Sequence, residues 1–193
     1  MIVRVKASKD AFTFGNLVKN TGLDEILEIG HSDLQGAEGS SKAFLSFVVN
    51  KPDQYEVCKH KVTLNLKEVR SENLTNPCIL DVYTVDSDWS EGVGQISDEP
   101  HTTGSITCKE EPSNVKFVNS VIFTPESRNL DIRLDVTDLV DNVQSGTEVT
   151  FMIRLADESL ADDRNMRLMY YGKDTHTCSW PYLDFELEDS VQD

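Results

Sequence analysis

Two short segments of the chain each place a cysteine and a histidine two residues apart, at Cys58–His60 and at His176–Cys178. In an extended segment this spacing puts both side chains on one face. Together the two pairs offer the thiolates and imidazoles that a zinc site uses. Zinc sites more commonly space their cysteines and histidines differently, as C-x₂₋₄-C and H-x₃₋₅-H. We therefore favour the alternative of buried or idle thiols and predict no resident metal.

The two tryptophans, Trp89 and Trp180, are candidate binding residues. An indole face stacks well on a sugar ring, and tryptophan is also the strongest anchor at protein interfaces. The alternative is that both rings pin loops to the body of the fold. Trp180 comes directly before Pro181, at the start of a predicted strand, which favours packing there. Both residues are kept as candidates for sugar binding or loop contact.

Carboxylates crowd one stretch of the chain and could supply the six to eight oxygen ligands of a calcium ion. Their spacing does not follow the EF-hand pattern, and a solvated acidic loop is the interpretation we favour. The acidic 157–164 stretch could also bind calcium, and there too we favour a solvated loop. We therefore predict no cofactor and keep calcium binding as an open alternative. The residues concerned in the first stretch are Asp86, Asp88, Glu91, Asp98 and Glu99.

Catalytic chemistry has little support in the sequence. With 34 acidic residues, pairs of carboxylates arise everywhere by chance, and spacing along the chain cannot reveal a sugar-sized cleft. The histidines lie in no HExxH or nucleophile-elbow context, and no glycine-rich phosphate-binding loop is present. We expect a protein that is not an enzyme. The histidines are His31, His60, His101 and His176.

The elements that must position these residues are predicted to be strands. Apolar and polar residues alternate over 62–66, 130–136, 149–155 and 183–187, which is typical of half-buried strands. Further strand candidates are 2–7, 25–29, 43–49, 78–85, 116–123 and 166–171. About ten strands of this kind indicate an all-β fold, a single antiparallel sandwich of jelly-roll type. Parallel sheets would instead show continuous apolar runs.

Only one short helix is expected, over 137–143, with Thr137 as its N-cap and Gly146 ending the segment. A loop of 29 residues, 86–114, joins two strand candidates, and a loop of this length is usually functional or an interaction arm. Residues 1–188 are expected to form one domain, and the acidic tail 189–193 to fray.

The formal net charge is −16 over 193 residues, with a sequence pI near 4.5. Such a chain is a poor candidate for binding nucleic acid or anionic lipid. No apolar run reaches the length of a membrane span, and no basic and apolar leader follows Met1. We therefore expect synthesis in a cytoplasm without export. Many acids, such as Asp131, Asp135, Asp184 and Glu186, occupy the polar positions of alternating strands, so the charge indicates a solvated exterior.

Five short segments follow one another along nearly the whole chain: Asp10–Phe12, Ser41–Phe47, Ser87–Glu91, Leu134–Val140 and Pro181–Phe185. In this order they resemble the DNRLRE-type β-sandwich family, a jelly-roll domain related to carbohydrate-binding modules. The resemblance implies a β-sandwich and a link to glycan binding.

Three segments are more specific, because they resemble virion proteins of contractile-tailed bacteriophages: Asn20–Ile29, Trp89–Gly104 and Lys173–Thr177. Those proteins are structural components of the tail, baseplate or fibre. The chain departs from them after Gly104, where a second tryptophan is common and Ser105–Cys108 stands instead.

Our leading hypothesis is a structural virion protein, located in the particle and docking neighbouring virion proteins in several symmetric copies. A module that binds host-surface polysaccharide is the alternative, and a glycan hydrolase is the third. The missing leader favours the virion over a secreted module.

Overall fold

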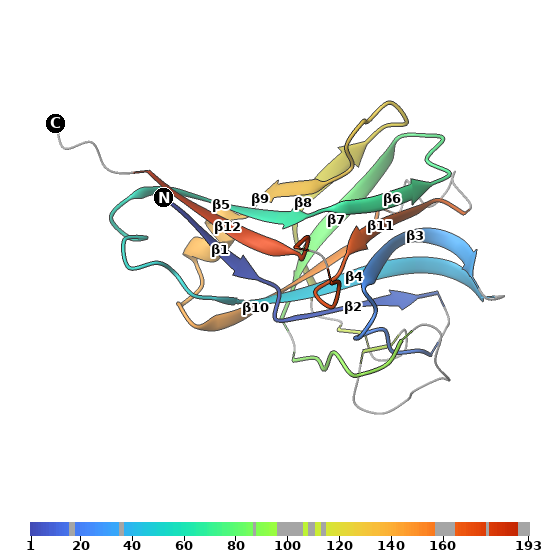
Figure 1. Cartoon of the computed structure of the whole chain (residues 1–193), viewed down its shortest axis with the longest axis horizontal. Coiled ribbons are helices and arrows are strands. Elements are labelled where there is room, and N and C mark those ends of the chain that lie inside the picture. The colour runs from blue at the N-terminus through green and yellow to red at the C-terminus, as the bar shows by residue number, and fades with distance from the viewer. Residues whose placement is uncertain are drawn as a thin grey trace.

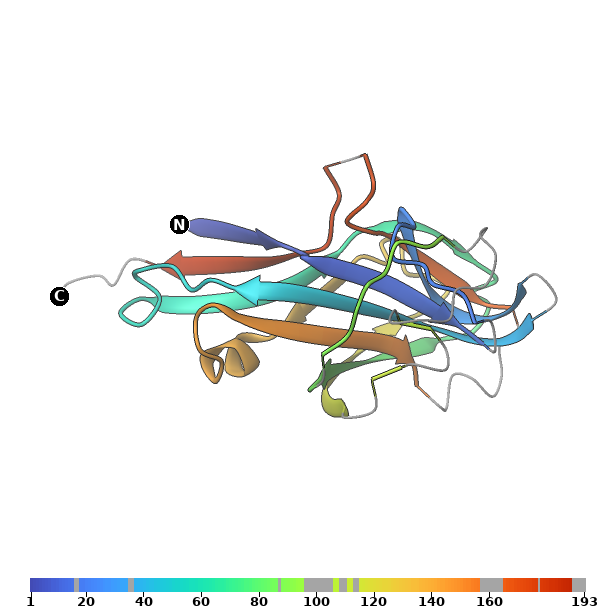
Figure 2. The ribbon, with the colours of Figure 1, turned by 90° about the horizontal axis from the view of Figure 1, so that it is seen from below.

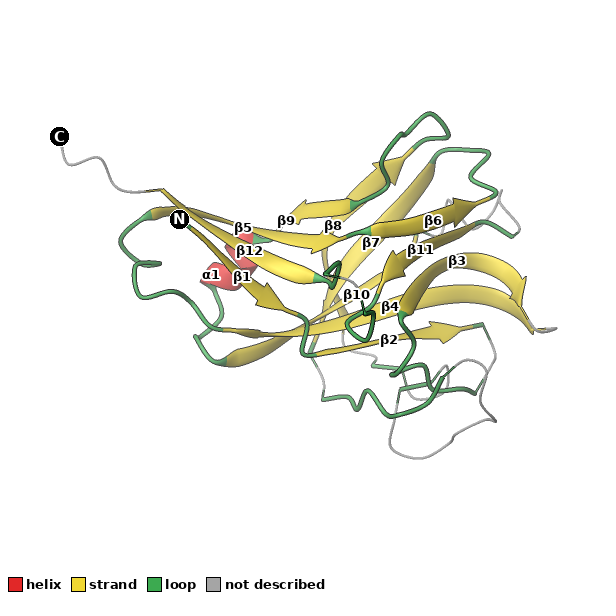
Figure 3. Ribbon diagram, in the orientation of Figure 1, coloured by secondary structure: helices red, strands yellow, loops and turns green. Residues whose placement is uncertain are grey.

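The structure is a computed structural model that describes residues 1–15, 18–34, 37–86, 88–95, 106–107, 111–112, 115–156, 165–176 and 178–188. These residues form strands and one short helix, α1 (Thr137–Asp141), as Figure 3 shows. The strands are β1 (Ile2–Lys6), β2 (Lys9–Phe14), β3 (Ile26–Leu34), β4 (Ala37–Val49), β5 (Lys59–Leu66), β6 (Glu68–Glu72), β7 (Cys78–Val85), β8 (Val115–Phe123), β9 (Ile132–Asp135), β10 (Thr147–Leu155), β11 (Arg167–Tyr171) and β12 (Tyr182–Glu188).

Two antiparallel sheets pack face to face (Figure 1). The smaller sheet has the strand order β1-β12-β5-β9. The larger sheet has the order β6-β11-β3-β4-β10-β7-β8, and β2 also pairs with β4. This arrangement confirms the predicted all-β antiparallel sandwich. Strands β9 and β8 end the two sheets on the same side of the molecule.

The core forms between the sheets because strands such as β12 alternate inward apolar and outward polar residues. In β12, Leu183, Phe185 and Leu187 are buried, while Glu186 and Glu188 are exposed. From the facing sheet, residues of β4 and β10 such as Phe47 and Phe151 are fully buried and meet edge to face at a centroid distance of 6.0 Å. The predicted alternation therefore defines the core.

The strand boundaries differ from the prediction in two ways. Strands β2 and β6 are additional, so the described residues form twelve strands where about ten were expected. Strands β3 and β4 run beyond the predicted 25–29 and 43–49. The residues of β6, Glu-Val-Arg-Ser-Glu, are mostly polar because β6 is an edge strand, and this hides it from an analysis of hydrophobic periodicity.

The short helix lies where it was predicted, but its cap is different. The N-cap is Val136, with no side-chain cap hydrogen bond, so the prediction of Thr137 as N-cap is wrong. Thr137 Oγ1 instead donates to Asp135 Oδ1 at 2.6 Å and accepts from the N–H of Val62 at 2.9 Å. Gly146, at φ 88°, forms the turn before β10 rather than the end of the helix.

No strand or helix occurs among the described residues between the end of β7 and the start of β8, where the long loop was predicted. Its described part (green in Figure 2) crosses the outer face of the larger sheet. A second, smaller apolar cluster lies beneath it, made by Ala11, Phe44, Val85, Trp89, Ile106 and Met152. The loop thus has its own hydrophobic contact with the sandwich. Residues 96–105 and the tail 189–193 lie outside the described residues.

Candidate functional site

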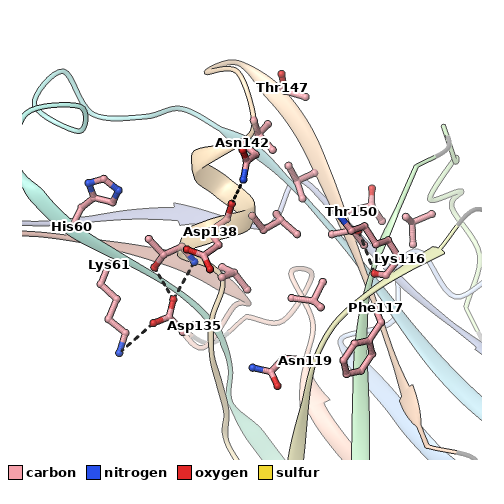
Figure 4. Close-up of a pocket in the computed structure, with 18 of the residues that line it drawn as sticks. His60, Lys61, Lys116, Phe117, Asn119, Asp135, Asp138, Asn142, Thr147 and Thr150 are labelled. Carbon is pink, nitrogen blue, oxygen red and sulfur yellow. Dashed lines mark hydrogen bonds and ion pairs between the residues drawn. The ribbon is translucent and has the colours of Figure 1, made fainter.

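An open groove of about 1050 Å³ lies on the side of the molecule where the edge strands β9 and β8 diverge (Figure 4). One wall comes from the start of β5, the end of β12, the end of β9 and α1. The other comes from the end of β7, β8 and the start of β10. Six carboxylates and three lysines are among the lining residues, so the groove is more acidic than basic. The carboxylates are Asp86, Asp135, Asp138, Glu148, Glu186 and Glu188.

The best-placed carboxylate of the groove already has partners. Asp135 accepts hydrogen bonds from the hydroxyl and the N–H of Thr137, at 2.6 Å and 3.0 Å. The hydroxyl contact is the main reason that the pKa of Asp135 is lowered, and this stabilises its ionised form. A general acid needs a raised pKa. Asp135 therefore acts as a structural acceptor that holds the start of α1.

Strand β8 forms part of the groove rim and carries exposed apolar residues. It pairs with β7 on one side, and no strand of the described residues pairs with its other edge. Phe117 is 54% exposed and Ile122 is 64% exposed. Phe117 leans edge to face on Tyr83 at a centroid distance of 5.7 Å, and Figure 4 shows its ring beside Asn119 and Lys116. An open edge strand with exposed apolar residues is a site for docking another chain.

Trp89 lies in the second apolar cluster, on the outer face of the larger sheet, and is 9% exposed. Its ring tilts against Phe44 at a centroid distance of 6.2 Å. Its Nε1 donates to both Ser46 Oγ and Thr150 Oγ1, at 3.0 Å and 3.1 Å. A ring held in this way anchors the loop to the sandwich, and it is not presented to solvent as a sugar platform would be.

Trp180 lies just before β12, outside the cluster that holds Trp89, and is partly exposed. Its Nε1 donates to the carbonyl oxygen of Thr175 at 2.9 Å, and the ammonium of Lys6 lies 3.3 Å from the ring centroid. Arg4 stacks on Tyr182 in the same manner, at 3.8 Å. The two tryptophans therefore do not form one site, and one face of the Trp180 ring is covered by a cation.

A cluster of carboxylates joins Glu91, one of the acids considered for calcium, to two acids that the sequence did not single out. Asp10 on β2, Glu91 in the long loop and Asp174 after β11 each bring a carboxylate oxygen within 4.8 Å of the others. The ammonium of Lys173 lies 3.0 Å from Glu91 Oε1 and 2.6 Å from Asp174 Oδ2. Glu91 also accepts the N–H of Asp10 at 2.6 Å. This cluster joins three segments that are far apart in the sequence.

Asp10 is the fully buried member of this carboxylate cluster. Burial raises its pKa to about 7, although the N–H of Lys173 donates to its Oδ2 at 2.5 Å and opposes the shift. Burial also raises the pKa of Glu91. A group without exposed surface cannot meet a polysaccharide, so the raised pKa values do not define a glycosidase pair.

Asn20 is a second residue of this region whose role could not be predicted from its residue type or spacing. It lies in the Asn20–Ile29 segment, which resembles phage virion proteins. It is buried, and its amide binds the segment after Trp89. Its Nδ2 donates to the carbonyl oxygens of Glu91 and Ile106, at 2.5 Å and 3.2 Å, and its Oδ1 accepts the N–H of Gly94 at 2.7 Å. These bonds hold the long loop against the segment between β2 and β3.

The two Cys/His pairs do not gather into a zinc site. Among the described residues, the only group of metal-ligating side chains is the carboxylate cluster, which contains neither pair. His60 Nε2 lies 2.9 Å from Asp141 Oδ1, and His176 Nε2 lies 3.5 Å from Glu25 Oε1. Of the other acids considered for calcium, Asp98, Glu99 and the 157–164 stretch lie outside the described residues.

Comparison of the sequence with protein-family models and with curated proteins returns no match. Within the part of the chain that the structure describes, no helix is long and apolar enough to cross a membrane. The class that fold and site define is an all-β sandwich with an open edge strand, a groove beside it and a long loop fastened to its outer face.

Proposed function

We propose that this chain is a non-enzymatic structural protein of a bacteriophage virion that docks neighbouring virion proteins. The observation that carries the proposal is the open edge of β8, with Phe117 exposed in the groove lining and Ile122 exposed further along the strand. A second chain can pair with such an edge through main-chain hydrogen bonds while its side chains enter the groove. The resemblance of the Trp89–Gly104 segment to phage structural proteins adds the virion context.

The fixed long loop supports the same function. Trp89, Asn20 and the small apolar cluster hold its described part on the sandwich. The carboxyl groups with raised pKa values, those of Asp10, Glu28 and Glu91, do not line the groove. Such a surface suits a structural protein of a symmetric assembly, which functions through its shape and through the number of copies that pack together.

Mass spectrometry of purified particles tests the proposal, because a structural protein must be present in them. The docking edge is tested with the variant Phe117→Asp, which places a charge on the exposed rim. We expect this variant to fold as the wild type does and to be lost from particles. The control is Val57→Asp, a charge at an exposed apolar residue outside the groove, which should assemble normally. Absence of the wild-type protein from particles would refute the proposal.

A glycan-binding module is the second candidate, and the groove favours it. Phe117 presents an exposed aromatic ring there, with the amides of Asn119 and Asn142 among the lining residues. Sugar sites commonly combine a stacking ring with such polar groups. Binding to host polysaccharide that Phe117→Ala abolishes would support this function. Trp89→Ala is less informative, because Trp89 is part of the packing of the loop.

A further inference from the structure

Asp10 has a buried oxygen atom without a partner. The residue has no exposed surface, and its Oδ1 accepts no hydrogen bond, whereas its Oδ2 accepts the N–H of Lys173. Buried carboxylate oxygens are almost always paired, because desolvation is costly when nothing replaces water. This oxygen therefore points to a ligand that supplies positive charge.

The surroundings of Asp10 carry an excess of negative charge. Three carboxylates, of Asp10, Glu91 and Asp174, lie together and face one ammonium, that of Lys173. The ammonium contacts Glu91 and Asp174, which leaves the Oδ1 of Asp10 unpaired. Two formal negative charges remain in the cluster, which is the charge that a divalent cation would balance.

We propose that the carboxylate cluster of Asp10, Glu91 and Asp174 binds a calcium ion. The available ligands are oxygens, which hard cations prefer to the nitrogen and sulfur ligands of zinc. Calcium–oxygen bonds of roughly 2.3 to 2.6 Å let opposite ligands lie about 5 Å apart. This span accommodates three oxygens that lie within 4.8 Å of one another. Magnesium spans only about 4 Å and is expected to fit less well.

The bound ion would join β2, the long loop and the connection between β11 and β12, which projects from the body of the molecule in Figure 2. Lys173 competes for the same carboxylates, so its ammonium acts as the counter-ion when calcium is removed. Calcium binding therefore fastens the outer loops to the sandwich. This inference does not rest on the proposed virion function.

The test uses the full chain after treatment with a chelator. Calorimetric titration with calcium chloride should show one saturable site, and magnesium should bind at least ten-fold more weakly. At a calcium concentration about a hundred-fold above Kd, the midpoint of thermal unfolding should rise by about 5 to 10 °C. The absence of saturable calcium binding would overturn the proposal.

Two variants test whether calcium binds at this cluster. They also distinguish a calcium site from an ion-pair network that only stabilises the fold. Asp10→Asn removes the buried charge and should weaken calcium binding at least ten-fold, whereas the control Asp53→Asn, in an exposed loop, should leave it unchanged. Lys173→Met removes the competing ammonium and should strengthen binding several-fold. Calcium binding that is unaffected by both Asp10→Asn and Lys173→Met would place the ion elsewhere and refute the site.

Discussion

The side-chain amide of Asn20 donates to the carbonyl oxygen of Glu91 at 2.5 Å, across 71 residues of sequence. This contact joins the segment before β3 to the segment that follows Trp89. The backbones also approach closely here, since a Cβ atom on Gly22 would collide with the same carbonyl oxygen. The position of the long loop is therefore set by hydrogen bonds and close packing rather than by a strand.

Replacing Asn20 should release the loop. In Asn20→Asp an acceptor oxygen would face the carbonyl oxygens of Glu91 and Ile106, which now accept from Nδ2. We expect the free energy of unfolding to fall by about 3 kcal/mol, the cost of leaving buried polar groups unpaired. Urea unfolding measures this loss, and proteolysis within 88–95 should become faster. Asn50→Asp, at an exposed position, is the control, and an equal loss there would contradict the prediction.

Trp89 combines packing with a shared hydrogen bond, and two substitutions separate these contributions. Trp89→Phe keeps an aromatic ring against Phe44 but loses the donor to Ser46 and Thr150, whose hydroxyls still bond each other at 2.6 Å. It should cost about 1 kcal/mol in the free energy of unfolding. Trp89→Ala also creates a cavity and should cost about 3 to 5 kcal/mol. Thermal or urea unfolding of both variants tests this order, and equal losses would show that packing contributes little.

The sandwich was predictable because its central strands are amphipathic. Strands β10 and β12 alternate in sequence, and the buried positions of β12 are the apolar ones. The edge strand β6 was missed, because an edge that faces solvent has no need of an apolar pattern. Periodicity therefore identifies the strands that form the core and overlooks those that border it.

The carboxylate cluster was not predictable by the same means. Asp10 on β2, Glu91 in the long loop and Asp174 after β11 are brought together by tertiary contacts between distant parts of the chain, and no spacing along the sequence records this. With 34 acidic residues, no one of them stands out by type. Trp89 could be identified as a candidate because the chain has only two tryptophans. Whether it contacts a sugar or anchors the loop depends on its burial, which the sequence does not show.

A buried ion pair in the larger sheet is expected to be sensitive to the loss of one partner. Glu28 is buried, accepts from Ser41 Oγ at 2.9 Å and pairs with Arg167 at 3.5 Å. Arg167 also pairs with the partly exposed Glu72. Burial raises the pKa of Glu28 despite these contacts. Arg167→Met leaves the charge uncompensated and should reduce the free energy of unfolding at pH 7 by about 3 kcal/mol.

The loss in Arg167→Met should depend on pH. Without Arg167 the pKa of Glu28 rises further above its value in the unfolded chain, so the folded state is favoured when Glu28 is protonated and loses stability as pH rises. Urea unfolding at pH 5 and pH 7 should therefore show the smaller loss at pH 5. The double variant Glu28→Gln/Arg167→Met removes both charges and should recover most of the stability, and a double variant no more stable than Arg167→Met would refute this explanation.

His60 should add stability only in acid. Its Nδ1 and Nε2 lie 3.0 Å from the Cys58 carbonyl oxygen and 2.9 Å from Asp141 Oδ1, two acceptors that only the protonated ring can satisfy together. Burial lowers the pKa of His60, but these hydrogen bonds outweigh it and the pKa is raised. The stabilisation is therefore complete below the unfolded pKa and is lost as pH rises through the folded one. Asp141→Asn should cost about 0.5 to 1 kcal/mol more at pH 5.5 than at pH 8.5 in urea unfolding. The control is Asp53→Asn, at an exposed loop residue, and it should show no such difference. An equal cost of Asp141→Asn at both pH values would rule out the charged contact.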